Sequence, residues 1–286
     1  GRVEYYHHML GAVLVHPKHR EVIPLAPEPI VKGDGATKND CERNAAKRLL
    51  SDLRREHPHL KILIVEDGLA ANYPHLSLLD SLKMNYVIGV KEGDHAYLFD
   101  WIKDLKPSLH EQEDEDGTQH KFRYYHDVPL NDAHHDYRVT VVEYWETKKS
   151  GKQQYFSWIT KLPVTKENCY EIMRAGRSRW RIENETFNTL KNQGYNFEHN
   201  YGHGYNNLCS VMTMLMMLAF LVDQVQQHCC KVYQKARQHV GTLRGLFEKV
   251  RNRIDIGVWD NWHHLYTFIG DPTSRPPPVN DSWLIR

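Results

Sequence analysis

The chain has 286 residues and a formal net charge of +1 at pH 7, and 41% of its residues are hydrophobic. The hydrophobic content supports a sizeable core. The net charge is too small to attract nucleic acid by itself, so any binding of nucleic acid must come from a local basic surface. The five cysteines include no C-x-x-C pair. Their scatter disfavours a zinc site or a disulfide framework and indicates a reducing, cytoplasmic compartment.

The first third of the chain predicts alternating strands and helices. Short apolar runs over residues 9–15 and 21–25 predict an antiparallel pair of strands. Residues 38–58 have helical periodicity, with Asn39 as the predicted N-cap and Glu42 in capping-box position. Asp40 is therefore expected to belong to the first turn of this helix and not to a catalytic site.

A strand that ends in acid follows this helix. Residues 61–68, "KILIVEDG", are typical of a central strand covered on both faces. A helix over residues 75–82 and a second buried strand over 86–92 complete a parallel unit. Glu66 and Asp67 point to opposite faces at the carboxyl end, where α/β sheets place their sites, although such acid pairs also occur in solvated turns.

The middle of the chain predicts an antiparallel β insertion. An acidic segment over residues 110–120 is expected to be a flexible loop, and aromatic and β-branched runs follow it. The aromatic side chains of these runs indicate sheet packing, with base stacking as the alternative; they are Tyr124, Tyr125, Tyr144, Trp145, Phe156 and Trp158.

From Asn168 onward the pattern is mainly helical. The apolar run over residues 208–222 is shorter than the ~18 to 20 residues that span a bilayer, so it predicts a buried core helix and no membrane association. A basic segment follows, which is either a phosphate track or a solvated helical face; its cations are Lys235, Arg237, Arg244, Lys249, Arg251 and Arg253.

Residues 179–191, "RWRIENETFNTLK", place acids among apolar side chains on one predicted helix. At about 100° per residue, Glu183 falls on the side of Trp180 and Phe187, whereas Glu185 falls on the opposite side. A carboxylate on a packing face is costly unless it is paired or bound to a metal. Glu183 is therefore either a metal ligand or the partner of Arg179 four residues earlier.

Two histidines, His199 and His203, have a spacing that metal ligands also show. The glycines beside His203 indicate a loop, and no glutamate follows the first histidine as a zinc protease helix requires. A zinc site at this place is not expected.

Together these features resemble the RNase H-like catalytic domain of DDE transposases from bacterial insertion sequences, over residues 9–221. "ILIVEDGLAANYP" is similar to the block of the second aspartate, which the resemblance assigns to Asp67. "RWRIENETFNTLK" is similar to the glutamate block of the cut-and-paste group and assigns Glu183. The resemblance implies an RNase H-like mixed sheet flanked by helices, with an antiparallel β insertion before the last catalytic helix.

Two positions depart from that glutamate block. The related signature has a tyrosine three residues before the arginine, where this chain has Gly176, and its lysine lies seven residues after the glutamate, whereas Lys191 lies eight after Glu183. The first aspartate of the family belongs to a strand that this chain does not contain, since Asp34 and Asp40 come too late. We expect that aspartate upstream of Gly1, which would leave this chain by itself inactive.

The resemblance implies cleavage at transposon ends and strand transfer into target DNA. Asp67 and Glu183 are the implied ligands of Mg²⁺, with Mn²⁺ as an alternative. Arg179, Arg181, Lys191 and the basic segment are the implied DNA contacts, and a homodimer is the implied form that holds two ends of double-stranded DNA. The alternatives are an inactive DNA-binding remnant and an RNase H-like nuclease without strand transfer.

The predicted organisation has four parts. Residues 1–103 form the first part of the core, 104–167 the β-rich insertion, 168–236 the helical return, and 237–286 a basic C-terminal segment and tail.

Overall fold

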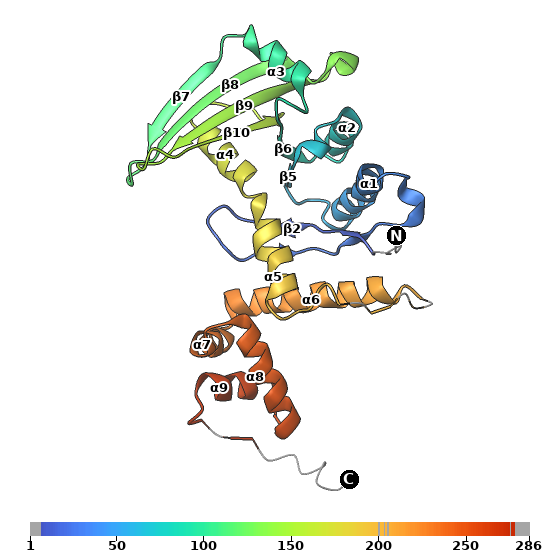
Figure 1. The fold of residues 1–286 in the computed structure, drawn as a ribbon, viewed down its shortest axis with the longest axis vertical. Helices are drawn as coiled ribbons and strands as arrows, with labels where there is room; N and C mark the ends of the chain where they lie inside the picture. Colours follow the sequence, from blue (N-terminus) through green and yellow to red (C-terminus); the bar gives the residue numbers. More distant parts are fainter. Residues whose placement is uncertain (1–6, 200, 203, 205, 275, 278–286) are drawn as a thin grey trace, which may run out of the picture. The chain divides into compact units, whose positions relative to one another are not determined.

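The computed structural model describes residues 7–199, 201, 202, 204, 206–274, 276 and 277. The chain divides into two compact units, one formed by Gly1–Leu10 and Glu28–Trp180 and the other by Gly11–Pro27 and Arg181–Arg286. The chain thus crosses between the units three times. Figure 1 shows the elements of each unit along the sequence.

The first unit begins with a short antiparallel pair, β1 (Met9–Leu10) and β4 (Glu28–Pro29). The apolar run over residues 9–15 was predicted to be one strand, but it divides at Gly11 into β1 and a second strand that belongs to the other unit. A 3₁₀ turn, η1 (Lys32–Asp34), then leads to helix α1 (Lys38–Glu56).

Thr37, and not Asn39, caps α1. The Thr37 side chain accepts a hydrogen bond from the Asp40 amide at 3.2 Å, and its hydroxyl donates to the Asp40 carboxylate at 2.6 Å. The predicted cap was therefore two residues too late, because threonine and asparagine are both good caps and only the backbone decides between them. Asp40 lies in the first turn, as predicted.

A parallel strand–helix–strand unit follows α1 and confirms the prediction. Strand β5 (Leu63–Glu66) leads through a 3₁₀ turn, η2 (Gly68–Ala70), into helix α2 (Tyr73–Ser81) and then strand β6 (Asn85–Gly89). The two strands pair in parallel, from Leu63 opposite Asn85 to Glu66 opposite Ile88.

Strand β5 is an edge strand, and the prediction of a central strand covered on both faces was wrong. The six-stranded sheet has the order β5-β6-β10-β9-β8-β7, in which β5 pairs with β6 alone among the described residues. Its side chains are half-buried or exposed, whereas Tyr86, Val87 and Ile88 of β6 are buried. An apolar run without alternation does not by itself distinguish these two environments.

Helix α3 (Ala96–Lys103) leads from β6 into four antiparallel strands, and the antiparallel pairing of the last three agrees with the prediction for this region. They are β7 (Ser108–Glu113), β8 (Gln119–Pro129), β9 (Arg138–Thr147) and β10 (Gln153–Thr160), with a short 3₁₀ turn, η3 (Asp132–His134), before β9. Figure 1 shows them as one curved sheet. Strand β10 pairs antiparallel with β6, so these strands extend the core sheet and do not form a sheet of their own.

The acidic segment over residues 110–120 is a hairpin and not a flexible loop. His110–Glu113 belongs to β7, and the turn closes where the Asp114 amide donates to the Thr118 carbonyl at 2.9 Å. Alternate acidic side chains of an edge strand face solvent, which lets an acidic sequence form a strand.

Helix α4 (Cys169–Arg177) covers one face of this sheet. Its residues Cys169, Ile172 and Met173 pack in one buried cluster with Tyr144 and Trp158. The same cluster holds Tyr124 and Phe156, so four of the six aromatic side chains serve sheet packing as predicted. Helix α3 lies on the other face, where Tyr125 and Trp145 line a groove with Phe99 and Ile102.

The second unit begins with the antiparallel pair of β2 (Val13–Leu14) and β3 (Ile23–Pro24), which confirms the predicted pairing for this part of the run. A π-helical segment (Ile182–Phe187), α5 (Asn188–Asn192) and α6 (Leu208–Cys229) follow. Val22, Leu190, Met216, Met217 and Phe220 form the buried cluster of these elements.

Helix α6 was predicted to be a buried core helix, and most of it is not buried. Met216, Met217 and Phe220 are its buried residues. Large apolar side chains along it are exposed by about two fifths or more: Leu208, Val211, Met214, Leu215, Leu218, Val222 and Val225. In the part of the chain that is described, α6 is the helix long and apolar enough to cross a membrane by length and composition, which alone is weak evidence.

The chain ends in a small bundle of α7 (Lys231–Val240), α8 (Leu243–Ile256) and α9 (Trp262–Gly270). Their shared core consists of Tyr233, Ala236, Leu246, Leu265, Tyr266 and Ile269. The basic segment is therefore two helices divided at Gly241, whose positive φ of 86° ends α7.

Candidate active site

Asp67 lies in the first unit, directly after β5. Its side chain accepts a hydrogen bond from the Leu69 amide at 3.1 Å and so caps the 3₁₀ turn that follows the strand. The residue is exposed, and the turn holds its carboxylate at the carboxyl end of the parallel strand. A carboxylate in this position is available to a divalent metal ion.

The neighbouring acid, Glu66, is already paired. Its carboxylate lies 2.7 Å from Nε2 of His75, a residue of α2 whose side chain is buried. Nothing in the sequence pattern singles out His75, because a histidine in the first turn of a helix is ordinary. The pair holds Glu66 toward α2, which leaves Asp67 as the acid presented at the strand end.

Glu183 lies in the second unit, in the π-helical segment. The residue is exposed, and Trp180, the reference for the predicted apolar side, is 43% exposed. Glu185 is the more covered acid, since 17% of its side chain is exposed and Arg20 pairs with it at 3.0 Å. The predicted division into an inward Glu183 and an outward Glu185 was therefore wrong.

Two features explain this error: Trp180 is exposed and so does not mark the packed side, and the segment after it is not regular α-helix. The Asn188 amide donates to the Glu183 carbonyl five residues earlier, so this turn holds more residues than the α-helical turn assumed in the angular count. Each residue then advances by less than the assumed angle, and the faces shift.

Comparison with known families decides the class of this protein. The family model of the transposase DDE domain matches residues 24–221, which is more than half of the chain. The chain belongs to the DDE transposase family. The six-stranded mixed sheet flanked by helices agrees with the RNase H-like fold expected of such a transposase. No curated protein matches the chain.

Members of the DDE transposase family act on DNA and use divalent metal ions. Among the described residues, no group of three or more His, Cys, Asp or Glu side chains is arranged to hold a metal ion. Asp67 and Glu183 belong to different units, so their pairing at one site stays a prediction. Both are carboxylates, the donor type that suits a hard divalent cation.

In this transposase the position where the family signature has tyrosine is Gly176, and close packing against Trp158 leaves no room there for a side chain. It is buried in α4, and a Cβ on it would lie 2.5 Å from Nε1 and 2.6 Å from Cε2 of Trp158. The Trp158 indole thus occupies the space that a tyrosine side chain would need. At this position of the first unit, glycine and the Trp158 ring together fill the space that a larger side chain would occupy.

The extra residue between Glu183 and Lys191 coincides with the π-helical turn. A helical turn closed by a hydrogen bond to the fifth residue takes up one residue more than an α-helical turn. An interval of eight residues that includes such a turn therefore spans about the same number of helical turns as seven residues of α-helix. Lys191 itself pairs with Glu198 at 2.8 Å.

The other predicted DNA contacts are distributed over both units. Arg179 is half-buried in the first unit, and Arg181, in the second, donates from Nη2 to the Pro17 carbonyl at 3.3 Å. Of the two histidines with metal-like spacing, His203 lies outside the described residues, and His199 contacts the ring of Tyr201.

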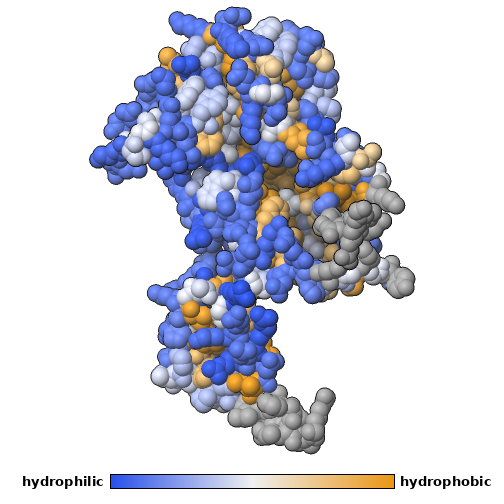
Figure 2. All heavy atoms as spheres, viewed as in Figure 1, coloured by the Kyte–Doolittle hydropathy of each residue, from blue (hydrophilic) through white to orange (hydrophobic). Residues whose placement is uncertain are grey.

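The basic segment is partly neutralised within the bundle. Lys235 lies 4.0 Å from Asp271 and Arg244 lies 3.3 Å from Glu248, while the Arg253 guanidinium stacks over Phe268. Lys249 and Arg251 are exposed and Arg237 is half-buried. Figure 2 shows a largely hydrophilic visible face on this bundle, in agreement with a solvated or phosphate-facing surface.

Proposed function

We propose that this protein is the catalytic part of a DNA transposase of the cut-and-paste group of bacterial insertion sequences, which cleaves DNA at transposon ends and joins the freed strand to target DNA. The observation that supports this proposal most is the exposed carboxylate of Asp67 at the carboxyl end of β5, in a chain that matches the transposase DDE domain.

Asp67 and Glu183 are the proposed ligands of a divalent cation, Mg²⁺ or Mn²⁺. Such a cation, when bound, lowers the pKa of a bound water or hydroxyl and stabilises the leaving oxygen of the phosphodiester. The pair of Glu66 and His75 would act as a positioning device, because it fixes the strand end from which Asp67 projects. The Leu69 amide holds the Asp67 carboxylate in one orientation.

The cations of the chain are proposed to bind the phosphates of double-stranded DNA. Arg179 and Arg181 flank the boundary of the two units along the sequence, and a guanidinium binds a phosphate through two parallel hydrogen bonds. Lys191 would leave its surface ion pair with Glu198 and bind a phosphate instead. Breaking this pair costs little, because surface ion pairs contribute ~0 to 1 kcal/mol to stability. The cations of α7 and α8 would extend this contact along the duplex.

The proposal includes a homodimer, because two transposon ends must be held together for joining. It also places the protein in the bacterial cytoplasm, where its DNA substrate lies. Sedimentation of the protein with and without a duplex that carries the transposon end tests the dimer.

The catalytic proposal is tested with the complete gene product and a labelled duplex that carries the end of its own element. Glu183→Gln and Asp67→Asn should each lower the rate of cleavage in Mg²⁺ by at least about a hundredfold, because each removes a charged metal ligand. Glu185→Gln is the matched control, since it lies on the same helix and should cleave at nearly the normal rate.

The products of that assay separate the alternatives. Cleaved ends covalently joined to target DNA support the transposase, whereas cleavage without joined product would indicate an RNase H-like nuclease. Binding without any cleavage would indicate a DNA-binding remnant. Normal cleavage by Glu183→Gln would remove Glu183 from the site.

A further inference from the structure

A pocket of about 630 Å³ lies beside Asp67 in the first unit. Three helix starts converge on it: Asn39 and Arg43 come from α1, Asn72 from the start of α2, and His95 with Tyr97 from the start of α3. Gly68 and Leu69, which directly follow Asp67, form part of its wall. Its volume falls in the range of about 300–1,000 Å³ that is typical of pockets for small-molecule ligands.

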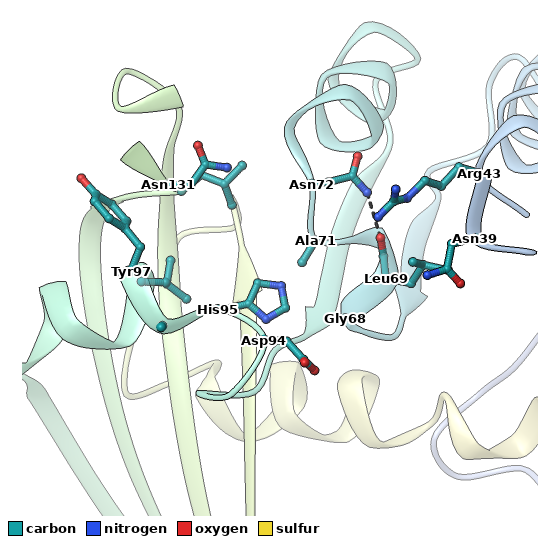
Figure 3. A pocket seen from close by; sticks show the side chains of 13 residues that line it. Asn39, Arg43, Gly68, Leu69, Ala71, Asn72, Asp94, His95, Tyr97 and Asn131 are labelled. Carbon is teal, nitrogen blue, oxygen red and sulfur yellow. Dashed lines mark hydrogen bonds between the residues drawn. The ribbon is translucent and has the colours of Figure 1, made fainter. Parts of the chain in front are cut away.

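The walls of this pocket are fixed by hydrogen bonds. The Asn72 side chain accepts from the His75 amide at 3.1 Å and donates to the Leu69 carbonyl at 2.8 Å, a bond drawn in Figure 3. On the opposite wall, the Asn131 side chain accepts from the His134 amide at 2.8 Å. The pocket is therefore formed before any ligand binds, which lowers the entropic cost of binding.

The His95 ring lies between these two walls. Figure 3 shows it with Asn131 and Tyr97 on one side and Asn72 and Arg43 on the other. The ring approaches the backbone so closely that a Cβ on Gly68 would lie 3.2 Å from its Cε1. A side chain at position 68 would therefore press against the His95 ring.

Positive charge at the pocket comes from Arg43 and from α3. The Arg43 side chain is 45% exposed, and its guanidinium lies 4.0 Å from the Asp40 carboxylate, the limit of a salt bridge. Helix α3 begins at Ala96 without a side-chain cap, and its first residues line the pocket. Asp94 is the one carboxylate among the lining residues, and it can accept a hydrogen bond from a base N–H, such as N3–H of thymine.

We propose that this pocket binds one nucleotide of a single-stranded DNA segment next to the Asp67 site. Arg43 and the amides at the start of α3 would hold the phosphate, and the base would stack on the ring of His95 or Tyr97. This inference rests on the proposed function, since it assigns the pocket to the strand that the transposase cuts. It places one nucleotide of that strand beside Gly68, the residue that follows Asp67.

The test measures binding of the 286-residue chain to a fluorescein-labelled DNA hexamer, (dT)₆, by fluorescence anisotropy in EDTA. Arg43→Gln should weaken binding by about tenfold, as expected for a lost charged hydrogen bond, and should reduce the slope of log Kd against log salt by about 0.7. Arg55→Gln is the matched control on the same helix, because Arg55 is 69% exposed and pairs with Asp52 away from the pocket.

His95→Ala should weaken binding by about fivefold or more through loss of stacking. Ultraviolet crosslinking of a hexamer that contains 5-iodouracil should place the crosslink on His95 or Tyr97. Circular dichroism establishes that each variant is folded, and Tyr97→Leu gives a second stacking variant that leaves the start of α3 unchanged.

Equal affinity of Arg43→Gln, His95→Ala and Arg55→Gln would overturn the proposal, as would crosslinks confined to other residues. Binding of dTMP as tight as that of the hexamer would also overturn it, because the pocket would then serve free mononucleotides. EDTA removes the metal, so these results stand apart from the cleavage assay. Loss of cleavage in Asp67→Asn with normal hexamer binding tests the catalytic site alone.

Discussion

Gly176 illustrates how one missing side chain determines local packing. The indole of Trp158 is buried against the α4 backbone at this residue, and the distances of 2.5 and 2.6 Å to a Cβ placed at position 176 involve the rigid ring itself. Neither partner is the far end of a flexible side chain. Any larger residue at position 176 must therefore displace the ring or the helix.

Gly176→Ala should destabilise the first unit by ~1 to 3 kcal/mol, the usual cost of overpacking a core. Gly33→Ala is the control, because a Cβ at that glycine meets nothing within 4 Å. Urea denaturation followed by tryptophan fluorescence measures both. Equal stability of the two variants would contradict the packing at Gly176.

Asp34 is a structural acid and not a displaced catalytic one. Hydrogen bonds from the Arg48 guanidinium, and then from the Val31 amide, lower the pKa of its carboxyl to about 2. Because this pKa is below the unfolded value, the ion pair stabilises the fold above about pH 4, and this contribution is lost as the pH falls toward 2.

Asp34→Asn should therefore lower the stability at pH 7 and flatten its dependence between pH 4 and pH 2. Asp52→Asn, which removes an exposed carboxylate on the helix that carries Arg48, is the control. Thermal denaturation over this pH range measures the effect. If stability fell between pH 4 and pH 2 as steeply in Asp34→Asn as in the unaltered protein, the stabilising role of the Asp34–Arg48 pair would be contradicted.

At the scale of the element, the π-helical turn absorbs one residue without interrupting the helix that carries Glu183 and Lys191. Deletion of Asn184, an exposed residue of this turn, should convert it to α-helix and give the interval of seven residues. Deletion of Ala219, an exposed residue of the regular helix α6, should instead rotate all following side chains by about 100°.

The first deletion should consequently lower the melting temperature much less than the second, as circular dichroism can show. Similar losses would indicate that the π-helical turn is not where the extra residue is accommodated.

Helix α6 buries one narrow face, and this orientation can be tested by paired substitutions. Phe220 is fully buried in the cluster of the second unit, whereas Leu218 is 55% exposed. Phe220→Ala should cost ~3 to 5 kcal/mol, and Leu218→Ala should change stability by less than about 0.5 kcal/mol. Denaturant titration of both variants decides the orientation, because a costly Leu218→Ala would contradict the exposed face.

At the scale of the whole molecule, the two units have separate cores but are not successive in sequence. Residues 11–27 of the second unit are inserted between strands of the first. Val22 joins the buried cluster of the second unit, and its amide donates to the Gln224 side chain at 3.2 Å. The second core therefore requires two chain segments, one before and one after residues 28–180 of the first unit.

The second unit contains a half-buried acid, Asp223, that should make the stability of this unit depend on pH. Burial raises the pKa of Asp223, against the opposing hydrogen bond that Tyr195 donates at 2.6 Å. The stabilisation from the protonated Asp223 carboxyl is complete below its pKa in the unfolded chain. It is lost as the pH rises through the higher pKa in the folded chain. Hydrogen exchange should therefore quicken with rising pH, after correction for intrinsic rates, in peptides of the second unit more than in those of the first.

Asp223→Asn should remove that difference, because asparagine can still accept the Tyr195 hydrogen bond without a charge. An equal response of both units, or no change in the variant, would contradict a role for Asp223.

Local pattern was sufficient for much of this protein. The sequence predicted the parallel pair β5 and β6, three of the four antiparallel strands (β8, β9 and β10) and the helical C-terminal part, because periodicity and turn residues act over a few neighbouring residues. The strand end pointed to the pair of Glu66 and Asp67, and the motif resemblance then selected Asp67 and indicated the DDE transposase family, which the family model shows.

Tertiary structure decided what depends on distant partners. The edge position of β5 is set by which strand pairs with it, and the pairing of Glu66 with His75 by how α2 packs on the strand. The predicted roles of Glu183 and Glu185 failed because Trp180 is exposed and because the π-helical turn departs from regular α-helical hydrogen bonds. The sequence by itself determined the residue types available for metal and DNA, whereas burial and backbone geometry decided which of them are presented.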